Sequence, residues 1–229
     1  MANYIQQANE QTLASLLQLH KTDIMNAINC HQVGEIVSFN PSTQTAEIEV
    51  KMLKMINGEL KDYPIIIDCP CIVCGGGEGV ITFPIKQGDS CLILFNDRDI
   101  DNWYSGGQKM QPRTDRTHSF TDAIALVGLR NKQNCLSGYL TSGAEFKYGG
   151  SSIKLENGKI TINNGSANVT ISGGQVTVSA TSITVDSTAV DFTGNVNIQG
   201  NLIVQTKNVG PLHTHSGVTP GDGNTGGVL

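Results

Sequence analysis

Two histidines near the carboxyl end, His213 and His215, are the side chains of this sequence best placed to bind a metal. The chain has only 5 histidines, and these two are separated by one residue. In an extended strand alternate side chains point the same way, with Cα atoms roughly 6.5–7 Å apart, so both imidazoles can face one point. Two nitrogens make a poor metal site, whereas three chains meeting on an axis would supply six. The alternative is a pair of exposed histidines, or one that binds metal fortuitously.

The segment that precedes this pair is a series of short apolar strands at a regular interval. Pairs of apolar residues at positions i and i+2 start six to nine residues apart, with Gly, Asn and Ser between them. Because the residues are mostly β-branched and turn formers recur, the pattern indicates strands rather than a helical heptad. The pairs are Ile153/Leu155, Ile160/Ile162, Val169/Ile171, Val176/Val178, Ile183/Val185, Val190/Phe192, Val196/Ile198 and Leu202/Val204.

One chain of this kind would bury only one apolar stripe per strand and would leave its strand edges open. Three chains around one axis would share their stripes in a common interior and pair their edges between chains. We therefore expect a homotrimeric intertwined β-helix. A single-chain β-solenoid, a β-sandwich and a disordered Ser/Thr/Gly/Asn-rich tract are the alternatives.

Residues 31–130 predict a small β-barrel. Expected strands run over 33–39, 46–52, 63–69, 80–85 and 91–95, and residues 46–52 alternate cleanly between apolar and charged side chains. About five strands with varied loops are typical of an OB-like barrel. An SH3-like barrel is the alternative.

The amino-terminal segment predicts a short amphipathic helix within residues 5–28, with Thr22-Asp23 as a possible cap that interrupts it. The segment lacks the basic start and unbroken apolar run of a signal peptide. No run of about 18 apolar residues occurs, so no transmembrane helix is expected.

Six cysteines raise the question of a second metal site. Cys69, Cys71 and Cys74 form a C-x-C-x2-C pattern that needs a fourth ligand, for which Cys91 or His118 is available. The paired C-x2-C modules of common zinc sites are missing from the sequence. Small buried thiols are the simpler interpretation.

The sequence does not favour an enzyme or a nucleic-acid-binding protein. Cys91 or Ser119 could be paired with His118 as a nucleophile, and Glu78 with Asp89 as an acid pair, but no catalytic motif surrounds them. The formal net charge is -5 and no basic stripe occurs.

Several stretches of the sequence resemble the central spike proteins of contractile phage tails. They are Phe83-Pro84-Ile85-Lys86-Gln87-Gly88-Asp89-Ser90-Cys91-Leu92-Ile93-Leu94-Phe95, then Asp97-Arg98-Asp99-Ile100-Asp101-Asn102-Trp103, then Arg116-Thr117-His118-Ser119-Phe120-Thr121-Asp122-Ala123-Ile124 with Gly128, and the terminal His213-x-His215.

The resemblance implies an all-β protein in four parts: a helical segment (1–29), an OB-fold barrel that docks to a baseplate hub protein (30–134), a trimeric β-helix shaft (135–206) and a pointed tip (207–229). It implies a structural iron ion, one per homotrimer, held on the three-fold axis by His213 and His215. Such a spike is assembled in the host cytoplasm, belongs to the virion and pierces the host outer membrane without enzymatic activity. A trimeric receptor-binding fibre or adhesin is the alternative, and a secretion-system or bacteriocin spike would share the same physics.

Overall fold

A computed structural model describes residues 13–56, 58–210 and 217 of the chain. The chain divides into two compact units, Met1–Tyr139 and Leu140–Leu229. The described part is mostly β and contains the amino-terminal helix that the sequence predicts, together with a second short helix that it did not predict.

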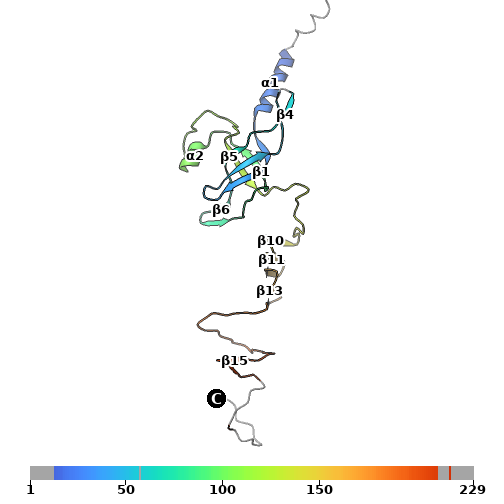
Figure 1. The fold of residues 1–229 in the computed structure, drawn as a ribbon, viewed down its shortest axis with the longest axis vertical. Helices are drawn as coiled ribbons and strands as arrows, with labels where there is room; N and C mark the ends of the chain where they lie inside the picture. The colour runs from blue at the N-terminus through green and yellow to red at the C-terminus, as the bar shows by residue number, and fades with distance from the viewer. Residues whose placement is uncertain (1–12, 57, 211–216, 218–229) are drawn as a thin grey trace, which may run out of the picture. The chain divides into compact units, whose positions relative to one another are not determined.

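The first unit contains a curved, five-stranded antiparallel sheet (Figure 1). Its strand order is β5-β2-β1-β8-β9. β1 and β2 are consecutive along the chain, whereas β9 joins the sheet after the long connection that follows β8. The outermost strands approach each other through a parallel bridge between Cys71 and Ala125. The sheet is therefore a half-barrel whose outermost strands come together at one point. The strands are β1 (His31–Asn40), β2 (Thr45–Val50), β5 (Ile66–Pro70), β8 (Ser90–Phe95) and β9 (Ala123–Val127).

One face of this sheet forms the core of the unit. Alternate residues of each strand point inward, so that Ile36, Ile48 and Ile93 have almost no exposed surface. Phe120 stacks on Tyr63 and on Phe95, with ring centroids 5.6 and 5.7 Å apart, and covers one end of the core.

The fifth barrel strand is not the one that the sequence suggested. The expected strand over residues 80–85 is wrong: only β7 (Gly79–Ile81) forms there, in a hairpin with β6 (Cys74–Gly76) outside the barrel sheet. The fifth strand is β9. It pairs with β8 along its whole length, from Cys91–Val127 to Phe95–Ala123. A second small hairpin joins β3 (Lys54–Ile56) to β4 (Glu59–Lys61).

The described residues contain two helices: α1 (Leu13–Ala27) precedes β1, and α2 (Asp101–Gly106) lies in the connection between β8 and β9. The expected interruption at Thr22-Asp23 is wrong, because α1 continues through both residues. The Thr22 hydroxyl donates to the carbonyl of Gln18 at 2.9 Å, which satisfies it inside the helix. Neither described helix is long and apolar enough to cross a bilayer.

The second unit is a five-stranded antiparallel meander in which each strand pairs with the next along the chain. Over residues 143–179 the ladders therefore lie within one chain, whereas the sequence predicted pairing between chains. Residues 180–202 contain no strand, and a two-stranded ladder follows. The strands are β10 (Gly143–Tyr148), β11 (Ser151–Glu156), β12 (Lys159–Asn163), β13 (Asn168–Ser172), β14 (Gln175–Ser179), β15 (Ile203–Val204) and β16 (Lys207–Asn208).

A glycine within β1, Gly34, allows the core residues of the barrel to pack closely against the backbone. A Cβ atom on Gly34 would lie 2.6 Å from Ile48 Cγ2, 2.7 Å from Ile93 Cδ1 and 3.1 Å from Cys91 Sγ. All three neighbours are fully buried and cannot retreat into solvent.

We predict that Gly34→Ala lowers the free energy of unfolding of the barrel by about 1–3 kcal/mol, because the added methyl group overpacks the core. Gly76→Ala is the matched control, since a Cβ there meets no atom within 4 Å. Denaturant titration followed by the fluorescence of Trp103, the single tryptophan, measures both. Equal stability of the two variants would contradict the packing argument.

Candidate functional site

The most unusual feature of the second unit is a sheet face made largely of apolar side chains. Cross-strand pairing places them in two rows across the five strands. Directly paired residues share a face in an antiparallel sheet, so all of these side chains point the same way. One row is Ala144, Leu155, Ile160, Ile171 and Val176, and the other is Phe146, Ile153, Ile162, Val169 and Val178.

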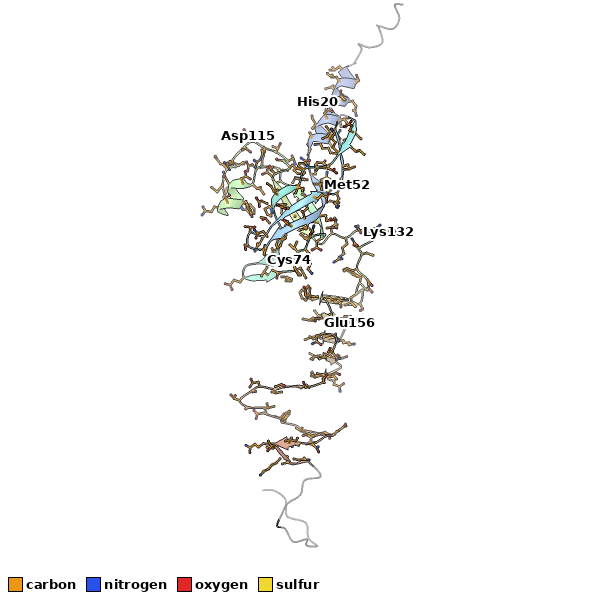
Figure 2. The ribbon with its side chains drawn as sticks, in the orientation of Figure 1. His20, Met52, Cys74, Asp115, Lys132 and Glu156 are labelled. Carbon is orange, nitrogen blue, oxygen red and sulfur yellow. The ribbon has the colours of Figure 1, made fainter. Side chains whose placement is uncertain are left out.

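The opposite face of the same meander is polar throughout. Lys154, Thr161 and Thr170 lie on one cross-strand row there, and Glu145 pairs with Lys154 at 3.5 Å at its end. Thr161 is half-buried, whereas its neighbours Ile160 and Ile162 are 37% and 47% exposed. The polar face is thus better covered than the apolar face. Figure 2 shows these side chains projecting on both sides of the strands, with Glu156 of β11 labelled.

The apolar face is also hollowed. An open groove of ≈ 450 Å³ runs across the strands and is lined by Phe146, Ile153, Ile162, Val169 and Val178. Contiguous apolar surface of this kind on a soluble protein marks a protein interface. In the described part of the unit, nothing in the chain covers it. We name these two rows and their groove the apolar face.

Residues 180–202 extend the same pattern without forming strands. Ile183, Val185, Val190 and Phe192 keep the i, i+2 spacing, and each is at least half exposed. The described backbone of this segment forms no ladder with the rest of the chain.

The predicted metal ligands, His213 and His215, lie outside the described residues. The site that they were predicted to form therefore stays a prediction.

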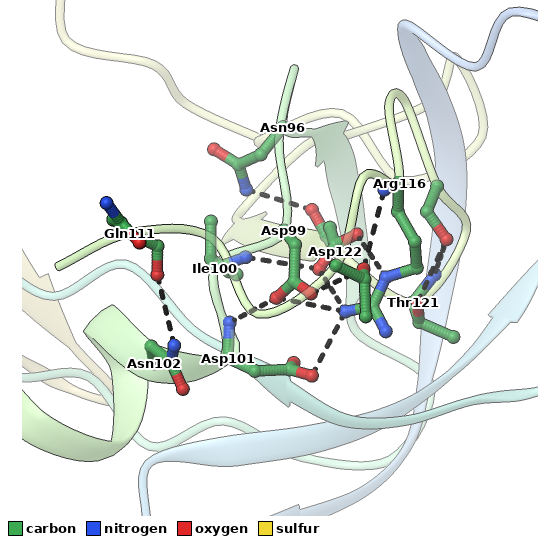
Figure 3. Close-up of polar contacts among 11 residues, drawn as sticks. Asn96, Asp99, Ile100, Asp101, Asn102, Gln111, Arg116, Thr121 and Asp122 are labelled. Atoms are coloured by element: carbon green, nitrogen blue, oxygen red, sulfur yellow. Dashed lines mark hydrogen bonds and ion pairs between the residues drawn. The ribbon is translucent and has the colours of Figure 1, made fainter.

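A salt-bridge cluster in the first unit explains two of the sequence stretches that carry the resemblance (Figure 3). The guanidinium of Arg116 forms a two-bond contact with Asp122, at 2.9 and 3.1 Å, and lies 3.1 Å from both Asp99 and Asp101. The cluster ties the start of the long β8–β9 connection to its end, directly before β9. Arg116 thereby positions the strand that closes the barrel.

The three carboxylates of this cluster lie close enough together to hold a cation. The Arg116 guanidinium already supplies the positive charge, however, and its hydrogen bonds to Asp122 raise the pKa of Arg116. The pKa of Asp99 is held below its usual range, chiefly by the 2.6 Å hydrogen bond from the Thr114 hydroxyl. The arrangement is a structural clamp. The available sequence signal was a stretch with five aspartates, Asp97, Asp99, Asp101, Asp115 and Asp122, around Arg116.

The cysteines do not gather into a metal site. Cys69, Cys71 and Cys91 are buried in the barrel core, whereas Cys74 is exposed on β6. The Nε2 atom of His118 lies 3.4 Å from Asp97 Oδ1. Within the described residues, the three metal-binding side chains that lie close together are those of Asp99, Asp101 and Asp122.

The barrel is also the part of the chain that is similar to a known family. The family model "Phage protein Gp138 N-terminal domain" matches residues 33–128, from β1 to the residue after β9. No curated protein matches this chain. The match indicates a phage protein with a structural role, associated with the virion.

The buried thiols give a pH dependence that can be measured. Burial raises the pKa of Cys69 to about 12 and of Cys71 and Cys91 to about 11, from 9.0. Between pH 9 and 11 the unfolded chain loses these protons and the folded barrel keeps them. Stability is therefore complete below pH 9 and falls as the pH rises.

We predict that the barrel unfolds at progressively lower denaturant concentration from pH 9 to pH 11. Cys91→Ala should flatten this dependence, while Cys74→Ala, at an exposed thiol, should leave it unchanged. Denaturation midpoints across the range provide the measurement. If Cys74→Ala removed the pH dependence of stability and Cys91→Ala did not, the assignment of that dependence to the buried thiols would be wrong.

Proposed function

We propose that this chain is the structural spike at the centre of a contractile phage-tail baseplate, a homotrimer that pierces the host outer membrane and has no enzymatic activity. The observation that carries the proposal is the uncovered apolar face of β10–β14. The phage-domain match over residues 33–128 supports the same conclusion.

Three copies can cover the apolar face in a way that one cannot. If each copy turns its sheet toward a common axis, the ten apolar side chains of each meander pack against those of its neighbours. The polar rows then form the outside of a three-sided prism. Burial of a single Ile or Val side chain contributes about 1.5–3 kcal/mol. A face-to-face dimer would also cover the rows, and the mass in solution separates the two arrangements.

Residues 180–202 support intertwining beyond the prism. Their backbone N–H and C=O groups need partners when the apolar pairs are buried. Strands of two other copies can supply those partners. In a trimer with a three-fold axis, the same segment of all three copies lies at the same height along that axis. A closed shaft of this kind leaves no strand edge open along its length.

The surface chemistry favours piercing over receptor binding. The polar face carries mainly short side chains, such as Thr161, Thr170 and Thr177. After Tyr148, Phe192 is the only aromatic residue of the sequence. Receptor-binding surfaces are typically rich in aromatic side chains.

The barrel is the part that we propose docks to the hub protein of the baseplate. Its two small hairpins expose several large apolar side chains that a docking partner would cover. They are Met55 and Leu60 on β3–β4 and Val80 and Ile81 on β6–β7, each at least half exposed.

We predict that Ile162→Asp converts the trimer to monomers. The change places three carboxylates in the shared interior, where burial of unpaired charge is strongly unfavourable. Thr161→Asp, one residue away on the polar face, should remain trimeric. Light scattering on the full-length proteins measures both. A monomeric mass for the unsubstituted chain would contradict the proposal. A dimeric mass would mean that two apolar faces pack face to face instead of three forming a prism.

The same two variants test the role in infection. Tail particles with Ile162→Asp should still adsorb to cells but fail to deliver the genome, whereas particles with Thr161→Asp should infect normally. Loss of adsorption would instead favour a receptor-binding fibre.

We further propose that His213 and His215 of three copies hold one iron ion at the tip. Six imidazole nitrogens suit an octahedral transition metal and leave no open position, which points to a structural role. Imidazole also binds nickel, copper and zinc, so iron rests on the family resemblance.

Elemental analysis should therefore find about one iron per three chains. Replacing both histidines by Ala should abolish the metal but not the trimer, because the shaft interior is much larger than the site. Thr214→Ala, between the two ligands, is the control and should retain it. Acid should release the metal because protonated imidazole cannot bind. Unsubstituted protein grown with iron, yet free of stoichiometric metal, would refute the site.

A further inference from the structure

The helix α1 is uncovered on every side. None of its 15 residues is buried, and it packs against no other helix or strand of the described chain. Isolated helices shorter than about 12–15 residues are marginal in water, and most helix stability in proteins comes from packing of an apolar side. No residue that the structure describes covers its apolar side, which is therefore open to another copy of the chain.

Some of the apolar residues of α1 form a seam at coiled-coil spacing, whereas Leu19 and Met25 lie off it. Leu13, Leu17, His20, Ile24 and Ala27 follow one another at intervals of four, three, four and three residues. This alternation is the spacing of the core positions of a coiled coil. Leu13, Leu17 and Ile24 are 71%, 57% and 45% exposed.

Two further apolar residues widen the seam. Leu16 and Ile28 lie directly beside the core positions, one on either side, and are exposed as well. The N–H of Ile28 donates to the carbonyl of Ile24 at 3.2 Å, so the helical turn includes it. An apolar side broader than the two core columns fits more than one neighbouring helix.

We propose that three copies of α1 form a short, parallel, three-stranded coiled coil through this seam. The inference rests on the proposed homotrimer, whose three-fold symmetry makes the helices parallel. It assigns the helix a function as a second trimerisation element, separate in sequence from the apolar face.

The charge of α1 is compatible with self-association. Lys21 and Asp23 are its only formally charged residues, one of each sign, so copies do not repel one another. A seam of period 3.5 complements an identical seam, because each core side chain fits between four residues of the facing helix. A flat partner surface would require no such period.

The coiled coil is too short to hold the trimer alone. It comprises about two heptads, fewer than the three or four that mark an independent coiled coil. Once the shaft joins three copies, the helices are tethered and associate at a high effective concentration. The barrel domain then lies, in sequence, between two trimeric segments, and α1 limits how far its amino-terminal end can move.

The test compares Leu17→Asp with Leu19→Asp in the full-length protein. Leu17 is on the seam and Leu19 is off it, yet in one copy their exposures are similar, 57% and 52%. Hydrogen–deuterium exchange of the α1 amides should become at least about tenfold faster in Leu17→Asp. It should stay unchanged in Leu19→Asp, and both variants should remain trimeric by light scattering.

A cross-linking experiment identifies the occupant. In a background in which the exposed cysteines Cys30, Cys74 and Cys135 are replaced by Ser, a cysteine introduced at Leu17 should form disulfides between copies under mild oxidation, and one at Leu19 should not. His20→Leu should slow α1 exchange, because it replaces a polar residue of the seam by an apolar one.

The outcomes separate this inference from the trimer itself. Equal exchange in the two Asp variants, or protection of α1 without disulfides at position 17, overturns the coiled coil while the trimer stands. A monomeric full-length chain overturns both. Seam-specific protection together with seam-specific disulfides supports both.

Discussion

The apolar face of β10–β14 is the constraint on which the rest of this structure depends. The five strands place two rows of apolar side chains on one face, with Tyr148 and Ser151 at its edge, and only polar or charged side chains on the other. A single chain that forms such a sheet leaves its most hydrophobic surface in water. The hydrophobic effect then favours association, and the two-row pattern leaves the polar face to meet solvent.

The barrel satisfies its own constraints within one chain. Its core contains Ile36, Ile48 and Ile93 at full burial, and Gly34 allows β1 to pass close to them. Arg116 balances the buried carboxylates of Asp99 and Asp122, so the long β8–β9 connection returns a strand to the right edge. The chain thus combines a self-sufficient domain with a segment that is incomplete without copies of itself.

Much of the barrel could be read from local patterns. Strand β2 was predicted from its alternation of apolar and charged residues, and β8 from a short apolar run between turns. β9 was missed, although Ala123–Val127 is also a short apolar run, because it follows a long polar connection. The segment 80–85 was misassigned because its apolar residues suggested a barrel strand, whereas only its first residues pair, and they pair with β6 outside the barrel sheet.

Local patterns predicted the strands β11–β14 and which of their side chains share a face, because the two-residue period of a strand depends only on local backbone geometry. They also predicted strands within residues 180–202, where none forms, and a metal site at His213 and His215, which lie outside the described residues. Only the tertiary structure decided that residues 143–179 pair within the chain, that β9 completes the barrel and that Arg116 joins three aspartates. These depend on register and on loop return, which bring together residues far apart in sequence and leave no local pattern.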